Sequence, residues 1–160
     1  MVIFGAGASY DSIPSRHPNE YPPARMEYRL PLAKELFDDR PLFNLWIDRF
    51  DHCQGVITRL REASKVSVEQ ELEKMLAEAE NNPWRHKQLA AVQFYLQSML
   101  WECKDRLKDW NTTTTVTNYK ELLVDVEDWR VRKAEKVCLV TFNYDTMLED
   151  ALPLVGVRIN

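Results

Sequence analysis

The segment VCLVTFNYD, residues 137–145, joins an apolar run to a group of polar side chains. Its first six residues are apolar apart from Thr141, and such a short run, rich in β-branched residues, predicts a buried strand of a parallel sheet. Asn143 and Asp145 follow directly, at the expected start of a new helix over 146–152. Side chains that follow a parallel strand lie at the carboxyl edge of its sheet, where ligands bind in α/β folds.

A second segment of the same kind opens the chain, MVIFGAGAS at residues 1–9. It predicts a short buried strand over 2–4 that enters a tight turn at Gly5 and Gly7. Glycines after a strand let the backbone approach a pyrophosphate, and the start of a helix supplies N–H donors. The alternative is a tight junction with no ligand. Tyr10 stands where the full dinucleotide fingerprint has its third glycine, which disfavours an ordinary Rossmann dehydrogenase. The two segments are expected to converge on one edge of the sheet.

Helices are expected between these strands. The proline-rich residues 10–31 predict a long irregular loop, and the threonine-rich residues 111–117 are the best candidate for a linker. Apolar residues at helical spacing predict helices over 32–37, 42–50, 67–80, 83–107 and 122–136. Pro153 is expected to end the last helix, and a third strand to begin within 155–159.

The predicted fold class is therefore α/β. It has a Rossmann-like parallel sheet and a large helical insertion between the first strand and the strand that precedes Asn143. The predicted parts are residues 1–31, which carry the first strand and its loop, the helical insertion 32–136, and residues 137–160, which carry the second strand and the following helix.

Composition excludes several classes of function. A net charge of −4 argues against a general nucleic-acid-binding surface. The longest apolar runs are too short to span a membrane, which favours a cytoplasmic protein. Three widely spaced cysteines, none in a Cys-x-x-Cys pair, predict neither a disulfide framework nor a structural zinc site, and we expect no metal.

The two segments together resemble the signature segments of the sirtuin-like domain, and in particular its zinc-free bacterial branch found in antiphage defence proteins. The resemblance is specific over 2–9 and 140–145, and residues 29–37 look like the family's segment after the cofactor loop. It implies a sheet that binds NAD as substrate. The residues that it places near the cofactor phosphates are Gly5, Ala6, Gly7 and Ser9. It further implies Thr141 beside the cofactor, Asn143 at the nicotinamide ribose and Asp145 at the nicotinamide carboxamide.

The activity that the resemblance implies is hydrolysis of NAD to nicotinamide and ADP-ribose, with Asn143 as the catalytic residue. Breaking the bond between ribose and nicotinamide develops positive charge on the sugar, which a carboxamide oxygen and a positioned water can stabilise. One alternative is a non-catalytic module that binds NAD or ADP-ribose and regulates a partner. A less favoured alternative is a protein deacylase, which usually carries a small zinc module.

The family's usual His-Gly segment and its downstream ribose- and adenine-binding segments do not occur here. Of the three histidines, only His17 is retained as a candidate site residue. We therefore expect an N-terminal fragment that is inactive alone, with a C-terminal sensor domain or partner protein elsewhere. A homo-oligomer is also expected, and neither a membrane nor a nucleic acid is expected as a partner of this segment.

Overall fold

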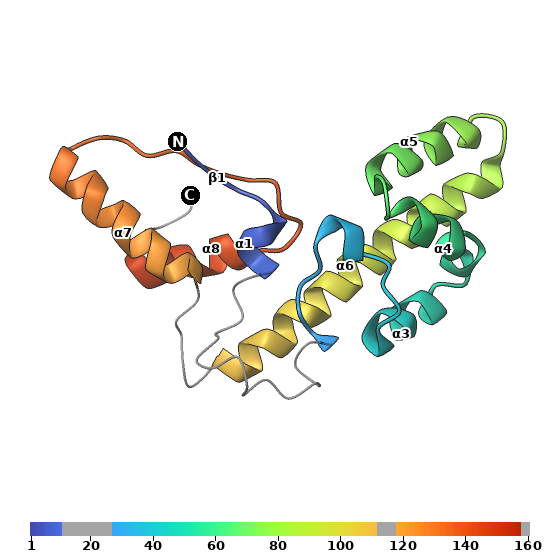
Figure 1. Cartoon of the computed structure of the whole chain (residues 1–160), viewed down its shortest axis with the longest axis horizontal. Helices are drawn as coiled ribbons and strands as arrows, with labels where there is room; N and C mark the ends of the chain where they lie inside the picture. The colour runs from blue at the N-terminus through green and yellow to red at the C-terminus, as the bar shows by residue number, and fades with distance from the viewer. Residues whose placement is uncertain (11–26, 112–117, 158–160) are drawn as a thin grey trace. The chain divides into compact units, whose positions relative to one another are not determined.

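The computed structural model describes residues 1–10, 27–111 and 118–157, with side chains for all of these except 107–111 (Figure 1). The chain forms two compact units. Unit 1 contains Met1–Leu30 and Cys103–Asn160, and unit 2 contains Pro31–Glu102. The residues predicted as one insertion, 32–136, are thus divided between the units. The predicted loop, the predicted linker and His17 lie largely or wholly outside the described residues.

Unit 1 holds a two-stranded parallel sheet made of β1 (Val2–Phe4) and β2 (Leu139–Thr141). Val2 lies opposite Leu139, and Phe4 lies opposite Thr141. The parallel pairing predicted from two distant apolar runs is therefore confirmed. Both strands have only three residues, although the pairing extends by one bond at the carboxyl end, where Phe142 N donates to Phe4 O over 3.2 Å.

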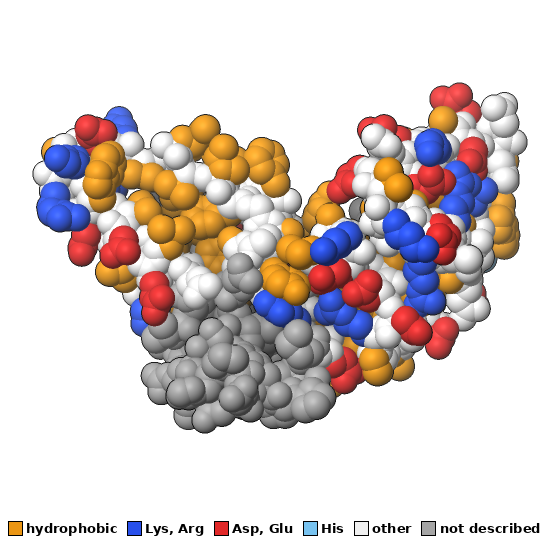
Figure 2. All heavy atoms as spheres, in the orientation of Figure 1, with side chains coloured by type: hydrophobic (Ala, Val, Ile, Leu, Met, Phe, Trp, Pro, Cys, Tyr) orange, Lys and Arg blue, Asp and Glu red, His pale blue; other side chains and the backbone are white. Residues whose placement is uncertain are grey.

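The two faces of this sheet differ in burial. The ring of Phe4 is buried and lies 5.4 Å from the ring of Tyr119, between centroids. On the other face Ile3 is 56% exposed, Phe142 is 74% exposed, and Met1 is also exposed. Figure 2 shows hydrophobic side chains gathered on the surface over this part of unit 1. The predicted burial of the strands is therefore only partial, since Phe4 is buried while Ile3 is exposed and all three residues of β2 are half-buried.

The helices of unit 1 are α1 (Ala6–Tyr10), the end of α6 (Pro83–Asn111), α7 (Asn118–Lys133) and α8 (Met147–Ala151). The α-helix α8 ends at Ala151 with Leu152 as its C-cap, just before Pro153 as predicted, and the 3-10 turn η2 (Leu152–Val155), which contains Pro153, follows it. Gly156 ends η2 with φ of 79°. The third strand predicted within 155–159 is absent over 155–157, the part of that range that the structure describes. Its start is occupied by η2.

Packing in unit 1 joins α7 to α8 and η2. Leu123 of α7 and Leu148 and Leu152 of the C-terminal turns are buried there. The ammonium group of Lys104, near the end of α6, lies 3.3 Å from the Asp150 carboxylate and also bonds to Thr146. These contacts fix the turn that follows β2, which is the turn that carries Asn143.

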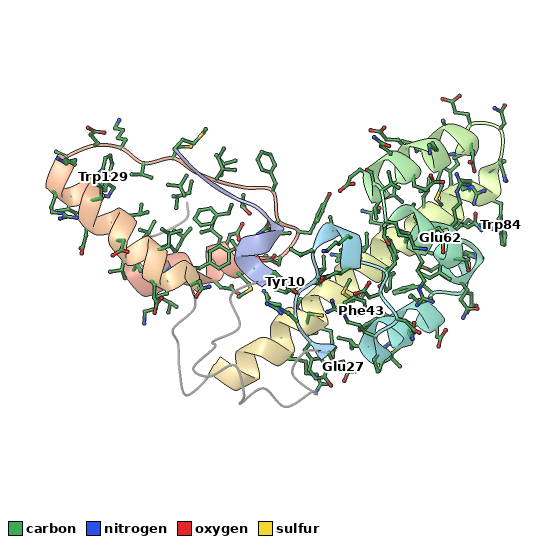
Figure 3. The ribbon with its side chains drawn as sticks, viewed as in Figure 1. Tyr10, Glu27, Phe43, Glu62, Trp84 and Trp129 are labelled. Atoms are coloured by element: carbon green, nitrogen blue, oxygen red, sulfur yellow. The ribbon has the colours of Figure 1, made fainter. Side chains whose placement is uncertain are left out.

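Unit 2 is helical. It contains η1 (Ala33–Glu35), α3 (Pro41–Arg49), α4 (Asp51–Ala63), α5 (Val68–Ala79) and the first part of α6. Phe43, a residue of α3 labelled in Figure 3, is fully buried. The predicted helix over 32–37 was wrong, since only a single 3-10 turn forms there. Sequence reasoning missed α4.

Two predicted helix starts in unit 2 are confirmed. Ser67 Oγ accepts a hydrogen bond from Gln70 N at the start of α5, and Asn82 Oδ1 accepts one from Trp84 N at the start of α6. Such side-chain caps satisfy backbone N–H groups that have no partner within the helix. The Arg59 guanidinium then ties α4 to α5 through Glu71 and Glu78. Unit 2 is thus an ordinary helical core.

Candidate functional site: a hydroxyl and amide cluster at the end of the sheet

Three polar side chains meet at the carboxyl end of the two strands. Asn143 Nδ2 lies 2.9 Å from Ser9 Oγ and 2.9 Å from Tyr119 Oη, and the two hydroxyl oxygens lie 2.8 Å apart. Ser9 and Tyr119 are each only 2% exposed. The predicted convergence of the two sequence segments is confirmed by the contact between Ser9 and Asn143, which are 134 positions apart.

Local structure explains how each side chain arrives there. Ser9 lies in α1, which begins two residues after β1 ends. Asn143 lies two residues after β2, and Thr141 Oγ1 accepts a hydrogen bond from its backbone N over 3.1 Å. This side-chain-to-backbone bond turns the chain sharply after the strand. Tyr119 lies in the first turn of α7, and its contact with the Phe4 ring directs its phenol toward the sheet edge.

Proton counting fixes the orientation of the Asn143 amide. With its nitrogen toward the hydroxyls, two amide N–H groups and two O–H groups supply protons for three contacts. With its oxygen toward them, only the two hydroxyl protons remain for the same three contacts. One contact would then have no proton, and the amide N–H groups would lose both partners. The orientation with the nitrogen inward is the stable one.

The carboxamide oxygen of Asn143 is the group that this orientation leaves free. Asn143 Oδ1 is buried and has no hydrogen-bond partner among the described residues. An unsatisfied buried acceptor destabilises a folded protein by roughly 1–3 kcal/mol. Such atoms in native structures call for an explanation, commonly a bound water or a ligand. Within the part of the chain that the structure describes, this oxygen is therefore available to accept a hydrogen bond from a further group.

Gly5 and Gly7 leave open space beside the cluster. Both are exposed, and a Cβ added to either would meet nothing within 4 Å. Gly156 is the only described glycine with positive φ. Neither positive φ nor a nearby atom requires glycine at position 5 or 7, and the alternative of a tight junction with no ligand stays open. Exposed backbone without side chains suits close approach by a ligand.

Asp145 has a structural role in this chain. Its Oδ1 accepts a hydrogen bond from Met147 N over 3.0 Å, at the start of α8. Asp145 lies one residue before the N-cap Thr146, which makes no side-chain cap bond, and its carboxylate accepts the first backbone N–H of the helix in its place. Thr141 likewise has a local role through its bond to the backbone of Asn143. Neither side chain contacts the cluster directly in any bond that the structure defines.

The cluster lies in a negative field. Burial raises the pKa of the Tyr119 phenol, and the nearby carboxylates of Asp145 and Glu149 raise it further, while the bonds from Ser9 and Asn143 oppose these effects. Tyr119 is therefore neutral at physiological pH and keeps its proton for hydrogen bonding. Glu149 Oε2 is also buried without a partner among the described residues. Negative charge close to the cluster favours a ligand that carries or develops positive charge.

Of the predicted site residues, the structure brings Ser9 and Asn143 into contact and places Gly5, Ala6 and Gly7 at the same strand end. Tyr119 was missed. It lies in neither segment, and a tyrosine in the first turn of a helix carries no distinctive signal. Only the packing of α7 against β1 reveals it.

A pocket of about 310 Å³ lies elsewhere in unit 1, between α7, β2 and η2. Its lining is mostly apolar, with Leu123, Leu139 and Val155 among its residues, and it contains no predicted site residue. The Arg130 guanidinium at this pocket is bound to the Glu127 carboxylate. Within the described residues, no group of three metal-ligating side chains occurs, and no helix is both long and apolar enough to cross a membrane.

Comparisons with known proteins give no assignment. No family model, no curated protein and no solved structure matches this chain.

Proposed function

We propose that this chain carries a sirtuin-like, Rossmann-like NAD-binding domain that hydrolyses NAD to nicotinamide and ADP-ribose. The observation that carries the proposal is the Asn143 amide, whose nitrogen is bound by two buried hydroxyls while its buried oxygen has no partner among the described residues. The two segments whose sequences resemble the family meet at this amide. The glycines beside it leave the backbone open.

The chemistry fits these groups. Hydrolysis adds one water to the ribose carbon, nicotinamide leaves with the electron pair of the broken bond, and one proton is released. The sugar becomes positively charged as the bond breaks. The Asn143 oxygen supplies a fixed negative dipole for that charge or for the attacking water, and the carboxylates near Tyr119 add to the negative field.

Binding of the cofactor is proposed at the end of β1. Gly5, Ala6 and Gly7 offer open backbone for the phosphates, and Ser9 connects this segment to Asn143. Thr141 is proposed to act through the backbone of Asn143, since its hydroxyl accepts the Asn143 N–H. Asp145 is proposed beside the nicotinamide carboxamide, in addition to its bond to Met147 N. We propose no metal in this reaction.

The test is release of nicotinamide from NAD by the natural protein that contains this chain. We expect Asn143→Ala to lower the rate at least about a hundredfold, as loss of one group that stabilises transition-state charge typically does. Asn81→Ala is the matched control, because Asn81 is an exposed asparagine in unit 2. Equal rates for the unsubstituted protein and Asn143→Ala would contradict the proposal.

A further inference from the structure

Tyr119 is the third member of the cluster, after Ser9 and Asn143, and it lies outside the two segments 1–9 and 137–145. Its phenol reaches Ser9 Oγ at 2.8 Å and Asn143 Nδ2 at 2.9 Å, while its ring packs against Phe4. The side chain is 2% exposed. A buried ring with two hydrogen bonds at its tip has little freedom to move. Tyr119 therefore fixes the positions of the two side chains that its phenol contacts, Ser9 and Asn143.

A single hydroxyl is not enough to orient an amide. The Ser9 hydroxyl can accept a bond from the Asn143 nitrogen or donate one to the Asn143 oxygen, so Ser9 alone permits both orientations. When Tyr119 is bonded to both partners, the contact between the two hydroxyls uses one of their protons. Only the orientation with the nitrogen inward then gives every contact a proton. The selection between the two orientations comes from Tyr119.

We propose that Tyr119 is a positioning residue for NAD cleavage: with Ser9 it holds the Asn143 nitrogen, so that the Asn143 oxygen is the group presented to the substrate. This inference rests on the proposed function. Tyr119 itself does not contact NAD in this proposal. Its neutral phenol is suited to the role, because a neutral hydroxyl donates and accepts at once.

The experiment compares Tyr119→Phe with Tyr95→Phe in the natural protein that contains this chain. Tyr119→Phe keeps the ring contact with Phe4 and removes only the hydroxyl. Tyr95 is the matched control, because it is a buried tyrosine of unit 2 whose hydroxyl bonds to Leu36 O. We expect Tyr119→Phe to lower kcat for nicotinamide release at least about tenfold with KM for NAD changed less than about threefold, and Tyr95→Phe to change neither.

A double-mutant cycle with Asn143→Ala separates positioning from a general structural role. If Tyr119 acts through Asn143, Tyr119→Phe lowers kcat in the unsubstituted protein but has no further effect once Asn143 is alanine. An equal further loss in the Asn143→Ala background would overturn the positioning role. So would an unchanged kcat in Tyr119→Phe alone. If the unsubstituted protein releases no nicotinamide, the proposed function fails, which is a distinguishable result.

A measurement on the unsubstituted protein keeps the proposal testable if Tyr119→Phe does not fold. Hydrogen exchange of the Asn143 side-chain amide, followed by NMR, is expected to be slower than that of the exposed Asn81 side chain. The expectation follows from the two buried bonds at Asn143 Nδ2. Equally fast exchange at both side chains would overturn the claim that the amide is held in place.

Discussion

At the scale of a single residue, substitution of Gly7 tests whether glycine is required there for protein stability or for ligand binding. It lies in α1 with open space where a Cβ would be, so Gly7→Ala is expected to leave the free energy of unfolding unchanged or raise it by up to about 1 kcal/mol. The same methyl group would occupy the space proposed for the phosphates. We therefore expect weaker NAD binding by calorimetry without loss of stability in urea unfolding.

Gly156 is the matched control for Gly7. Its φ of 79° is in the left-handed region, where a residue with a Cβ is strained. Gly156→Ala is expected to lower the free energy of unfolding by about 1–2 kcal/mol and to leave NAD affinity unchanged. If Gly7→Ala proved the more destabilising of the two substitutions, the glycine at position 7 would be serving the fold and not a ligand.

The contact between Ser9 and Asn143 was predictable from sequence because it follows from a general rule. Polar residues that follow two parallel strands meet at one sheet edge, whatever their separation along the chain. The third member, Tyr119, was not predictable in this way. Its position depends on how α7 packs against Phe4, and no local pattern encodes a contact between a helix and a strand end. Nor did the sequence reveal that the Asn143 oxygen is buried without a hydrogen-bond partner among the residues that the structure describes.

At the scale of elements, α8 depends on Asp145. Asp145→Ala removes the acceptor for Met147 N and is expected to lower the free energy of unfolding by about 0.5–2 kcal/mol. Asp145→Asn keeps a side-chain oxygen at that position, so its stability should stay within about 0.5 kcal/mol of the unsubstituted protein. Urea unfolding of both variants is the measurement. A large loss in Asp145→Asn would contradict the capping role.

These two variants also separate capping from cofactor binding. Because Asp145→Asn preserves the cap, any loss of NAD affinity in that variant reports the carboxylate charge alone. We expect a measurable loss, since the proposed site includes Asp145 at the nicotinamide carboxamide. Unchanged affinity would restrict Asp145 to the start of α8.

Secondary structure was predictable where a cap or a sustained apolar stripe marks an element. The helices α5 and α6 begin with side-chain caps at Ser67 and Asn82, and both starts were predicted. By contrast, α4 follows α3 after a single residue, Phe50, which caps α4 with no side-chain bond. The apolar stripe of the short segment after Pro31 was misleading, because only one 3-10 turn forms there.

At the scale of the whole molecule, alkaline pH is expected to destabilise unit 2 through Cys53. Burial raises the pKa of the Cys53 thiol to about 11, from an ordinary value of 9.0. The folded state therefore retains a proton that the unfolded state loses above pH 9. The stability from this group is fully present below pH 9 and falls as the pH rises toward 11, with a slope of up to about 1.4 kcal/mol per pH unit.

The measurement is urea unfolding between pH 8 and 10, a window that stays at or below the ordinary tyrosine pKa of 10.0. Cys53→Ala is expected to be less stable at every pH but to show a shallower decline above pH 9. Cys138→Ala is the control, because Cys138 is exposed. If the free energy of unfolding declined identically above pH 9 in Cys53→Ala and in the unsubstituted protein, the assignment of this pH dependence to the Cys53 thiol would be contradicted.

The division into two units was not predictable from the sequence. The predicted insertion was bounded by the strands, whereas the structure groups residues from Cys103 onward with the sheet. The reason is that α6 is one continuous helix whose apolar residues do not change in character where one unit ends and the other begins. A boundary within a regular helix leaves no change of composition to detect.

The most direct test of the central claim measures NAD binding and NAD consumption together, in the natural protein that contains this chain and in its Asn143→Ala variant. We predict that both proteins bind NAD in calorimetry and that only the unsubstituted protein converts it to nicotinamide and ADP-ribose. If both proteins bind NAD and neither converts it to nicotinamide and ADP-ribose, the chain is instead a regulatory module. Absence of NAD binding in both proteins would contradict the proposed nucleotide site at Gly5, Gly7 and Asn143.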